Sequence, residues 1–237
     1  ELGETDSKEE DIRKLREKMD LLALPKNIVK RLNEEIERYS FTSPSSPETT
    51  TIRTYIDWLM TLPWNVTTTD NRDVKKIEEV LDASHFGLNN AKKRIIEYIA
   101  VKKKTSSASS PIICLIGPPG VGKTSLASSI ATALGREFVK ISVGGINDEA
   151  EILGHRRTYI GAAPGKIIRQ MKKARTNNPV FLIDEVDKLT KDYKGDPASA
   201  LLEVLDREQN SRFCDNYIEE EFDLSKVLFV LTANNIS

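Results

Sequence analysis

The feature that most constrains the fold is a glycine- and proline-rich stretch, residues 117–124, which reads GPPGVGKT. It matches the pattern G-x-x-x-x-G-K-[ST], in which successive backbone N–H groups wrap around phosphates. The apolar run 112–116 before it predicts a buried parallel strand, and residues 125–134 after it predict a helix. A strand, this loop and a helix in that order favour an α/β fold with a phosphate site at the sheet edge. Because both flanks are correct, an ordinary strand-to-helix turn is the weaker interpretation.

The positions of this loop have expected roles toward a nucleoside triphosphate and its Mg²⁺ ion. Lys123 is expected to reach the β- and γ-phosphates, and the Thr124 hydroxyl is expected to ligate Mg²⁺. The helix that follows adds the positive end of its dipole. The predicted nucleotide-binding residues are Gly117, Pro118, Pro119, Gly120, Val121, Gly122, Lys123, Thr124, Ser125 and Asp184.

Two further apolar runs end in polar residues that suit the same site. Residues 180–183 lead into Asp184 and Glu185, and such a strand end lies beside the phosphate loop in open α/β sheets. Asp184 is predicted to hold Mg²⁺, and Glu185 is predicted to take a proton from the attacking water or to orient it. Residues 227–232 precede Asn234, whose amide would position that water or contact the γ-phosphate. Asparagine is common at turns, so the order of the three strands carries this last prediction.

Composition argues against several other classes. The 237 residues carry 35 Lys and Arg against 36 Asp and Glu, so charge does not indicate a nucleic-acid-binding protein. Cys114 and Cys214 have neither metal-ligand spacing nor a disulfide framework. No signal peptide and no apolar run of spanning length is found, so we expect a cytoplasmic protein without a membrane partner. His85 and His155 are expected to be structural.

Hydrophobic periodicity predicts two kinds of region. From residue 111 onward, expected strands alternate with expected helices. The strands lie near 112–116, 137–142, 179–184 and 227–232, and the helices near 122–134, 165–177 and 197–208. That alternation predicts a parallel sheet flanked by helices. Before it come helices near 7–23, 25–39, 48–60, 74–81 and 91–99, with a polar loop near 65–71. We predict a helical end of an N-terminal region at 1–70, a helical linker at 71–110 and a nucleotide-binding α/β domain at 111–237.

A long segment bounded by glycines, residues 144–165, holds Tyr159 and Ile160 next to Gly161. An aromatic–aliphatic pair is unexpected at a solvated loop tip, because burial of such side chains is favourable. The residues alone leave two interpretations open. Either the two side chains pack locally, or they contact something apolar and extended.

With these motifs the chain resembles the Lon family of ATP-dependent serine proteases, within the AAA+ ATPases. The resemblance rests on YIDWL at 55–59, LPW at 62–64, GHRRTYIG at 154–161, GDPASALLEVLD at 195–206 and the nucleotide motifs. It implies ATP or ADP with Mg²⁺, and a homohexameric ring that unfolds and translocates unfolded or damaged proteins. It also implies that Tyr159 and Ile160 form a substrate-gripping pore loop, that Tyr193 belongs to a second one, and that Asn234 senses the water or the γ-phosphate.

The resemblance further implies parts that residues 1–237 do not contain: the last sheet strand, an arginine finger, the helical lid and the Ser–Lys protease dyad. We therefore expect this chain alone to be monomeric, proteolytically inactive and a very weak ATPase. Two other classes stay open. One is an ATP-driven nucleic-acid remodelling subunit, which the charge balance disfavours. The other is an interaction module in which nucleotide only stabilises the fold.

Overall fold

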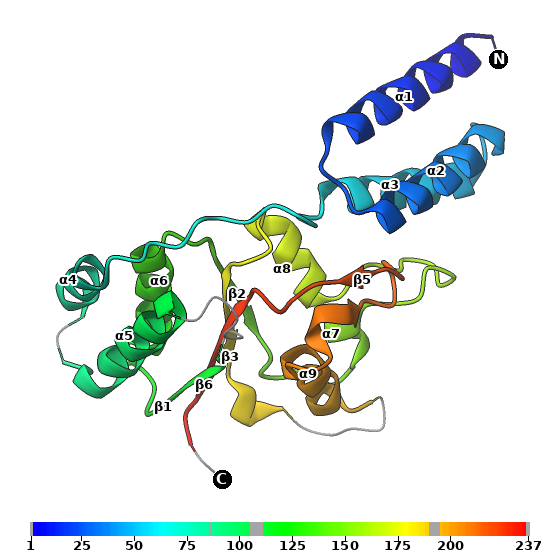
Figure 1. Cartoon of the computed structure of the whole chain (residues 1–237). Helices are drawn as coiled ribbons and strands as arrows, with labels where there is room; N and C mark the ends of the chain where they lie inside the picture. Colours follow the sequence, from blue (N-terminus) through cyan, green and yellow to red (C-terminus); the bar gives the residue numbers. More distant parts are fainter. Residues whose placement is uncertain (1, 86, 105–110, 190–194, 236–237) are drawn as a thin grey trace. The chain divides into compact units, whose positions relative to one another are not determined.

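The computed structural model describes residues 2–85, 87–104, 111–189 and 195–235 (Figure 1). The chain divides into two compact units, Glu1–Asn65 and Val66–Ser237. This division falls ahead of the expected boundary at residue 70, because residues 66–71 are hydrogen-bonded to the second unit. None of the helices in the described ranges is long and apolar enough to cross a membrane.

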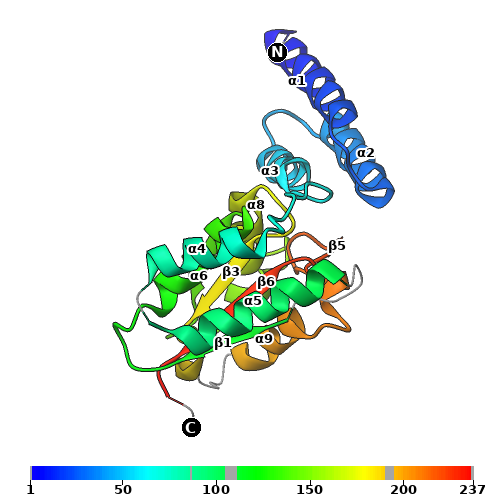
Figure 2. The ribbon, with the colours of Figure 1, turned by 60° about the vertical axis from the view of Figure 1, so that its left-hand side comes forward.

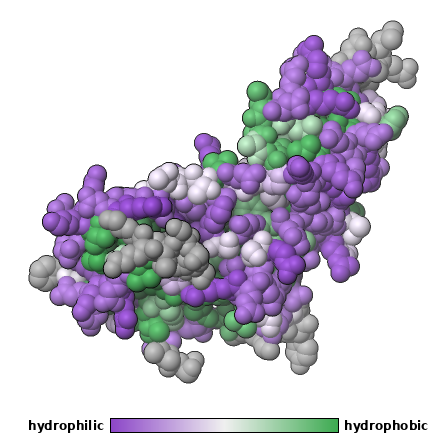
Figure 3. Space-filling model, viewed as in Figure 1, coloured by the Kyte–Doolittle hydropathy of each residue, from purple (hydrophilic) through white to green (hydrophobic). Residues whose placement is uncertain are grey.

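The first unit consists of α1 (Leu2–Leu21), α2 (Lys26–Phe41) and α3 (Pro47–Thr61), which confirms the three helices expected there. Proline stands at the N-cap of α2 and in the first turn of α3, and the Ser46 side chain caps α3 by accepting from the Glu48 N–H. Polar residues cover most of the visible face of this unit, while apolar residues show between its helices (Figure 3). The apolar stripes of α2 and α3 are buried: Ile28, Leu32, Ile36 and Tyr39, and Ile52, Tyr55, Ile56 and Leu59.

The second unit is built on a parallel sheet. Its strands are β1 (Ile113–Ile116), β2 (Phe138–Ser142), β3 (Val180–Asp184) and β6 (Leu228–Ala233), in the order β1-β6-β3-β2. All four expected strands are confirmed. The last of them in the chain, β6, lies between β1 and β3 and pairs in parallel with both. Residues that follow β6 therefore lie between those that follow β1 and those that follow β3.

Helices cover both faces of this sheet (Figures 1 and 2). One face is covered by α4 (Val74–Ser84), α5 (Asn89–Lys104) and α6 (Lys123–Leu134), whose apolar residues share one core with β3 and β6. On the other side lie α7 (Ala150–Leu153), α8 (Lys166–Ala174) and α9 (Pro197–Leu205). Short elements complete the unit: η1 (Val186–Lys188), η2 (Asn210–Arg212), β4 (Phe213–Cys214) and β5 (Glu221–Phe222), with β4 and β5 antiparallel.

Two helices are shorter than the sequence predicts. The helix expected to reach residue 177 ends at Ala174, because Arg175 takes a left-handed conformation with φ of 59°. The helix expected to reach residue 208 ends at Leu205, where Asp206 is extended and accepts a hydrogen bond from the Glu208 N–H. In both places the local backbone and side-chain bonds override the apolar periodicity.

Residues 66–71, here called the polar strap, run from the start of the second unit toward α4. Two asparagines after α8 hold one end, since Asn177 accepts from Thr67 Oγ1 at 2.7 Å and Asn178 accepts from the Thr68 N–H at 2.9 Å. Asn178 also donates to the Thr68 carbonyl at 2.8 Å. Both asparagines are buried, so these bonds satisfy amides that would otherwise be costly to bury.

The other end of the polar strap is fixed to the C-terminus of α6. Asp70 accepts from Arg136 Nε at 2.6 Å and from Nη2 at 2.8 Å, and the Arg136 side chain is only 3% exposed. The Asn71 N–H donates to the Leu134 carbonyl at 2.8 Å and the Asn71 side chain donates to the Ala133 carbonyl at 3.2 Å. The strap thus caps the helix that begins at the phosphate loop.

Candidate functional site

The stretch 117–124 forms the expected turn between β1 and α6. Gly120 and Gly122 have φ of 82° and 91°, a conformation that side chains with a Cβ rarely adopt. Gly122 is the N-cap of α6, so the helix begins at Lys123 with its first N–H groups free of intrahelical partners. The sequence folds this way because only glycine tolerates the two left-handed positions without strain. The result is a concave turn placed on a helix N-terminus, which suits an anion.

The Lys123 ammonium group lies across this turn. Its Nζ donates to the Gly117 carbonyl and, at 3.0 Å, to the Pro118 carbonyl. It also donates to Asn234 Oδ1 at 3.1 Å, so the structure brings together two residues predicted from separate motifs. All three acceptors are uncharged oxygens. A negatively charged phosphate would form stronger hydrogen bonds with the Lys123 ammonium group than they do. The turn and its lysine therefore fit a phosphate-bearing ligand.

Asp184 ends β3 next to this turn. Its carboxylate pairs with Lys140 Nζ at 2.6 Å and accepts a hydrogen bond from Thr232 Oγ1. Burial opposes ionisation of Asp184, but the hydrogen bonds from Lys140 and Thr232 outweigh that effect and lower its pKa. The carboxylate is thus ionised at neutral pH, which suits the predicted role of an oxygen ligand for Mg²⁺.

Glu185 directly follows and has a left-handed backbone with φ of 63°. Its side chain accepts a hydrogen bond from Ser142 Oγ at 3.1 Å and pairs with Lys188. The hydrogen bonds from Lys188 and Ser142 lower the pKa of Glu185. A Cβ at Gly144 would lie 2.6 Å from Glu185 Oε2, so a glycine is needed at that position for the carboxylate to stay where it is.

These groups line one cavity of about 820 Å³. The predicted residues on its wall are Pro119, Gly120, Gly122, Lys123, Thr124, Ser125, Asp184, Glu185 and Asn234. Gly117, Pro118 and Val121 belong to the same turn but are not on that wall. The volume falls within the range of about 300–1,000 Å³ that is usual for small-molecule sites.

Several residues of this site were not predicted from the sequence. Lys140 and Thr232 bond the Asp184 carboxylate, and His85 Nε2 lies 2.9 Å from Ser125 Oγ on the cavity wall. A signal for Thr232 existed, because parallel pairing of β6 with β3 places it level with Asp184. No comparable signal existed for His85, which precedes the phosphate loop by a helix and a linker.

The loop 154–165 lies between α7 and α8. Tyr159 is 64% exposed and Ile160 is fully exposed, so the local-packing interpretation of these side chains is wrong. The tip is a turn in which the Tyr159 N–H donates to Arg156 O at 3.1 Å and the Ala162 N–H donates to Tyr159 O at 3.1 Å. The third predicted pore-loop residue, Tyr193, lies outside the described residues.

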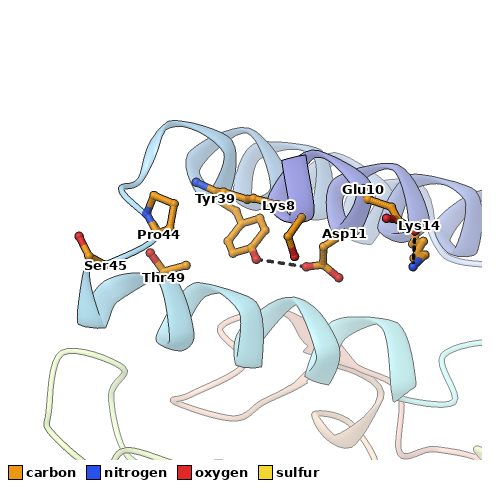
Figure 4. Close-up of a pocket in the computed structure, with 9 residues that line it drawn as sticks. Lys8, Glu10, Asp11, Lys14, Tyr39, Pro44, Ser45 and Thr49 are labelled. Atoms are coloured by element: carbon orange, nitrogen blue, oxygen red, sulfur yellow. Dashed lines mark hydrogen bonds and ion pairs between the residues drawn. The ribbon is translucent and has the colours of Figure 1, made fainter. Parts of the chain in front are cut away.

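A second cavity, of about 720 Å³, opens between the helices of the first unit (Figure 4). On its wall the Tyr39 hydroxyl donates to Asp11 at 3.1 Å, and Lys14 pairs with Glu10 at 2.7 Å. Arg53 also binds Asp11, at 2.8 Å. Lys8 donates to the Ser40 carbonyl at 3.2 Å and to the Thr42 carbonyl. Each charged residue on this wall thus already has a partner within the first unit, and none of them calls for a ligand.

Comparison with known proteins agrees with the geometry of the first cavity. Residues 113–237 match the ATPase family associated with various cellular activities (AAA). The chain is 57% identical over 234 residues to Lon protease of Dictyoglomus thermophilum and 56% identical over 237 residues to Lon protease 1 of Bacillus subtilis. These matches cover 99% and 100% of the chain but only 30% and 31% of the two relatives. Lon protease of Elusimicrobium minutum is 54% identical, again across the whole chain and 29% of the relative.

Proposed function

This chain belongs to the ATPase family associated with various cellular activities, and on that basis we propose that it is the ATP-hydrolysing motor portion of a Lon-like protease. The observation that carries the proposal is the convergence of Lys123, Asn234 and the Asp184–Glu185 pair at one sheet edge. ATP or ADP is the proposed ligand of the turn at 117–124. Its proposed substrates are unfolded or damaged proteins.

Each side chain has a distinct part in this proposal. Lys123 and the N–H groups at the start of α6 bind the β- and γ-phosphates. Thr124 and Asp184 are the oxygen ligands for Mg²⁺, which supplies charge neutralisation on those phosphates. Glu185, ionised at neutral pH, takes a proton from the attacking water. Asn234, already in contact with Lys123, orients the water or the γ-phosphate.

Replacing Lys123 by Ala tests nucleotide binding directly. The change removes a cation whose charge-assisted hydrogen bonding to phosphate contributes about 1.5–3 kcal/mol net, so the affinity for ADP and Mg·ATP should fall by about tenfold to hundredfold. Calorimetric titration of both nucleotides into the chain and the variant measures this difference. Lys188→Ala is the matched control, since Lys188 bonds Glu185 and is not on the cavity wall. Equal affinities for the chain and Lys123→Ala would reject the phosphate-binding role.

The exposed tip of the loop 154–165 is the proposed pore loop. Tyr159 and Ile160 present aromatic and aliphatic surface to solvent, which suits contact with many different polypeptide sequences. In the proposed full-length protease, Tyr159→Ala should slow degradation of an unfolded protein by about tenfold or more while basal ATP hydrolysis stays within about twofold. The two rates, measured on the same preparation, test this. Leu202→Ala, at an exposed apolar residue of α9, is the control.

We extend the proposal to assembly and location. Six copies are expected to form the working ring of the full-length protein, whereas this chain alone is expected to be monomeric. Cys114 and Cys214 are both free thiols, which suits a reducing compartment such as the cytoplasm. Sedimentation of the chain with and without nucleotide checks its assembly state.

A further inference from the structure

A fully buried carboxylate, Asp215, lies at the base of the loop that carries Tyr159 and Ile160. It follows β4 and accepts three backbone hydrogen bonds. Its Oδ1 accepts from the N–H groups of Tyr217 at 2.8 Å and Ile218 at 3.1 Å. Its Oδ2 accepts from the N–H of Gly165 at 2.7 Å. Oδ1 thus binds the backbone of its own segment, and Oδ2 binds the backbone at the end of the loop 154–165.

Both ends of the loop close tightly around this carboxylate. A Cβ at Gly154 would lie 2.6 Å from Asp215 Oδ1, and Gly154 also has φ of 85°. A Cβ at Gly165 would lie 2.0 Å from the Ile152 carbonyl oxygen. The two glycines that bound the loop are therefore needed for close approach, one to Asp215 and the other to the backbone of α7.

Neighbours of Asp215 reinforce the same attachment. The Asn216 N–H donates to Leu153 O at 2.7 Å, and the Asn216 side chain donates to Gly154 O at 3.1 Å. Farther along, Glu219 pairs with Arg157 of the loop at 2.6 Å. The segment 215–219 thus contacts the loop at its start, at its end and at Arg157, and leaves the tip exposed.

Burial of the Asp215 carboxylate costs free energy unless hydrogen bonds stabilise its charge. Burial raises the pKa of Asp215 to about 6, although the N–H groups of Gly165, Tyr217 and Ile218 and the charge of Arg169 act against that rise. A neutral amide would close the turn at Tyr217 and Ile218 equally well through its carbonyl oxygen. It could not accept from Gly165 at the same time, because its second polar atom is a donor. The bond to Gly165 is what specifically requires a carboxylate.

We propose that Asp215 is a positioning residue for substrate gripping, which fixes the base of the loop 154–165 so that its tip stays presented to the polypeptide. This inference rests on the proposed function of Tyr159 and Ile160. Asp215 does not touch the polypeptide. It acts through Gly165 and Gly154, while the exposed tip makes the contact with the polypeptide.

The substitution Asp215→Asn keeps one of the two acceptor oxygens and replaces the other by an N–H₂ donor, so it tests the bond to Gly165 alone. In the proposed full-length protease it should raise the KM for an unfolded protein such as casein by about tenfold to hundredfold, the factor that corresponds to one hydrogen bond to a charged group. The KM for ATP and the basal rate of ATP hydrolysis should stay within about twofold. Asp223→Asn is the matched control, since Asp223 Oδ1 accepts from the Ser225 N–H at 2.9 Å and an amide oxygen can do the same.

Hydrogen exchange distinguishes positioning from a general loss of structure. In the chain carrying Asp215→Asn, amides of residues 155–165 should exchange faster, while those of Tyr217 and Ile218 should stay protected. Faster exchange in both places would mean that Asp215→Asn disrupts the segment 215–219 as well as the loop, and would overturn the positioning role. Should Asp215→Asn not fold, Asn216→Ala removes the side-chain bond to Gly154 from an exposed position, and it must raise the KM for casein a fewfold.

The two proposals fail in different ways. If Tyr159→Ala slows degradation but both Asp215→Asn and Asn216→Ala leave the KM for casein unchanged, the positioning role is wrong and the pore loop stands. If Tyr159→Ala itself has no effect on degradation, the pore-loop assignment is wrong. An increase in KM for casein with unchanged ATP hydrolysis in Asp215→Asn, and no change in Asp223→Asn, supports the positioning role.

Discussion

Replacing Glu185 by Gln is expected to lower the rate of ATP hydrolysis by about 10²–10⁴, the usual contribution of a general base, while ATP still binds. The physical reason is that glutamine keeps the shape and the hydrogen bond from Ser142 but cannot take a proton. Single-turnover hydrolysis and calorimetric binding, measured on the proposed full-length protein, give the two quantities separately. Glu203→Gln, at an exposed glutamate of α9, is the control. Equal hydrolysis rates in Glu185→Gln and the parent protein would exclude Glu185 as the base.

The pH dependence of the ATP hydrolysis rate is a second test of Glu185. The hydrogen bonds from Lys188 and Ser142 lower the pKa of Glu185 below its ordinary value of 4.5, so the basic form is already complete at neutral pH. Activity that depends on this carboxylate should be lost only when the pH falls through that lowered pKa. In Lys188→Ala the acid limb of the profile should move up toward the ordinary range, because the larger of the two effects is removed.

Replacing Arg136 by Ala is expected to lower the free energy of unfolding of the chain substantially. The Arg136 side chain is 3% exposed and binds both oxygens of Asp70, so its removal leaves a carboxylate that is only 20% exposed without its cation. Breaking a buried pair from one side costs about 3–5 kcal/mol in the free energy of unfolding. Partial exposure of Asp70 places the expected loss toward the lower end of that range.

Urea unfolding of the whole chain, followed by far-ultraviolet circular dichroism, measures this loss. Arg94→Ala is the matched control, because Arg94 is 86% exposed and pairs with Glu97 at 3.7 Å. Exposed pairs of this kind contribute about 0–1 kcal/mol. A loss for Arg136→Ala no larger than for Arg94→Ala would mean that the Arg136–Asp70 pair does not stabilise the second unit.

The sequence predicted those parts of the molecule whose signal is local. Apolar runs located all four strands of the sheet, and the glycine pattern located the turn before Lys123. Parallel pairing then brings Asp184 and Asn234 to the same edge without further information, because strand ends of a parallel sheet meet there. The phosphate turn, Asp184, Glu185 and Asn234 were therefore predictable from loop chemistry and strand ends, whereas Lys140 and His85 were not.

The parts that could not be predicted depend on polar partners far apart in the chain. Nothing near Asn177 indicates that its amide binds Thr67, and nothing near Asp215 indicates that it accepts from Gly165. A polar residue in a sequence is consistent with solvent exposure as well as with a buried hydrogen bond. Only the fold decides between the two, so the polar strap and the base of the loop 154–165 emerge from the structure.

The strand order also has a consequence for synthesis of the chain on the ribosome. The strand β6 is the last of the sheet to be made, yet it fills the gap between β1 and β3 and brings Thr232 and Asn234 to the site. Until residue 234 has left the exit tunnel, β1 and β3 have no partner between them and Lys123 lacks its contact with Asn234. The candidate site of a nascent chain is thus incomplete until its sheet is closed, and until then the edges of β1 and β3 that face β6 stay unpaired and prone to association with other chains.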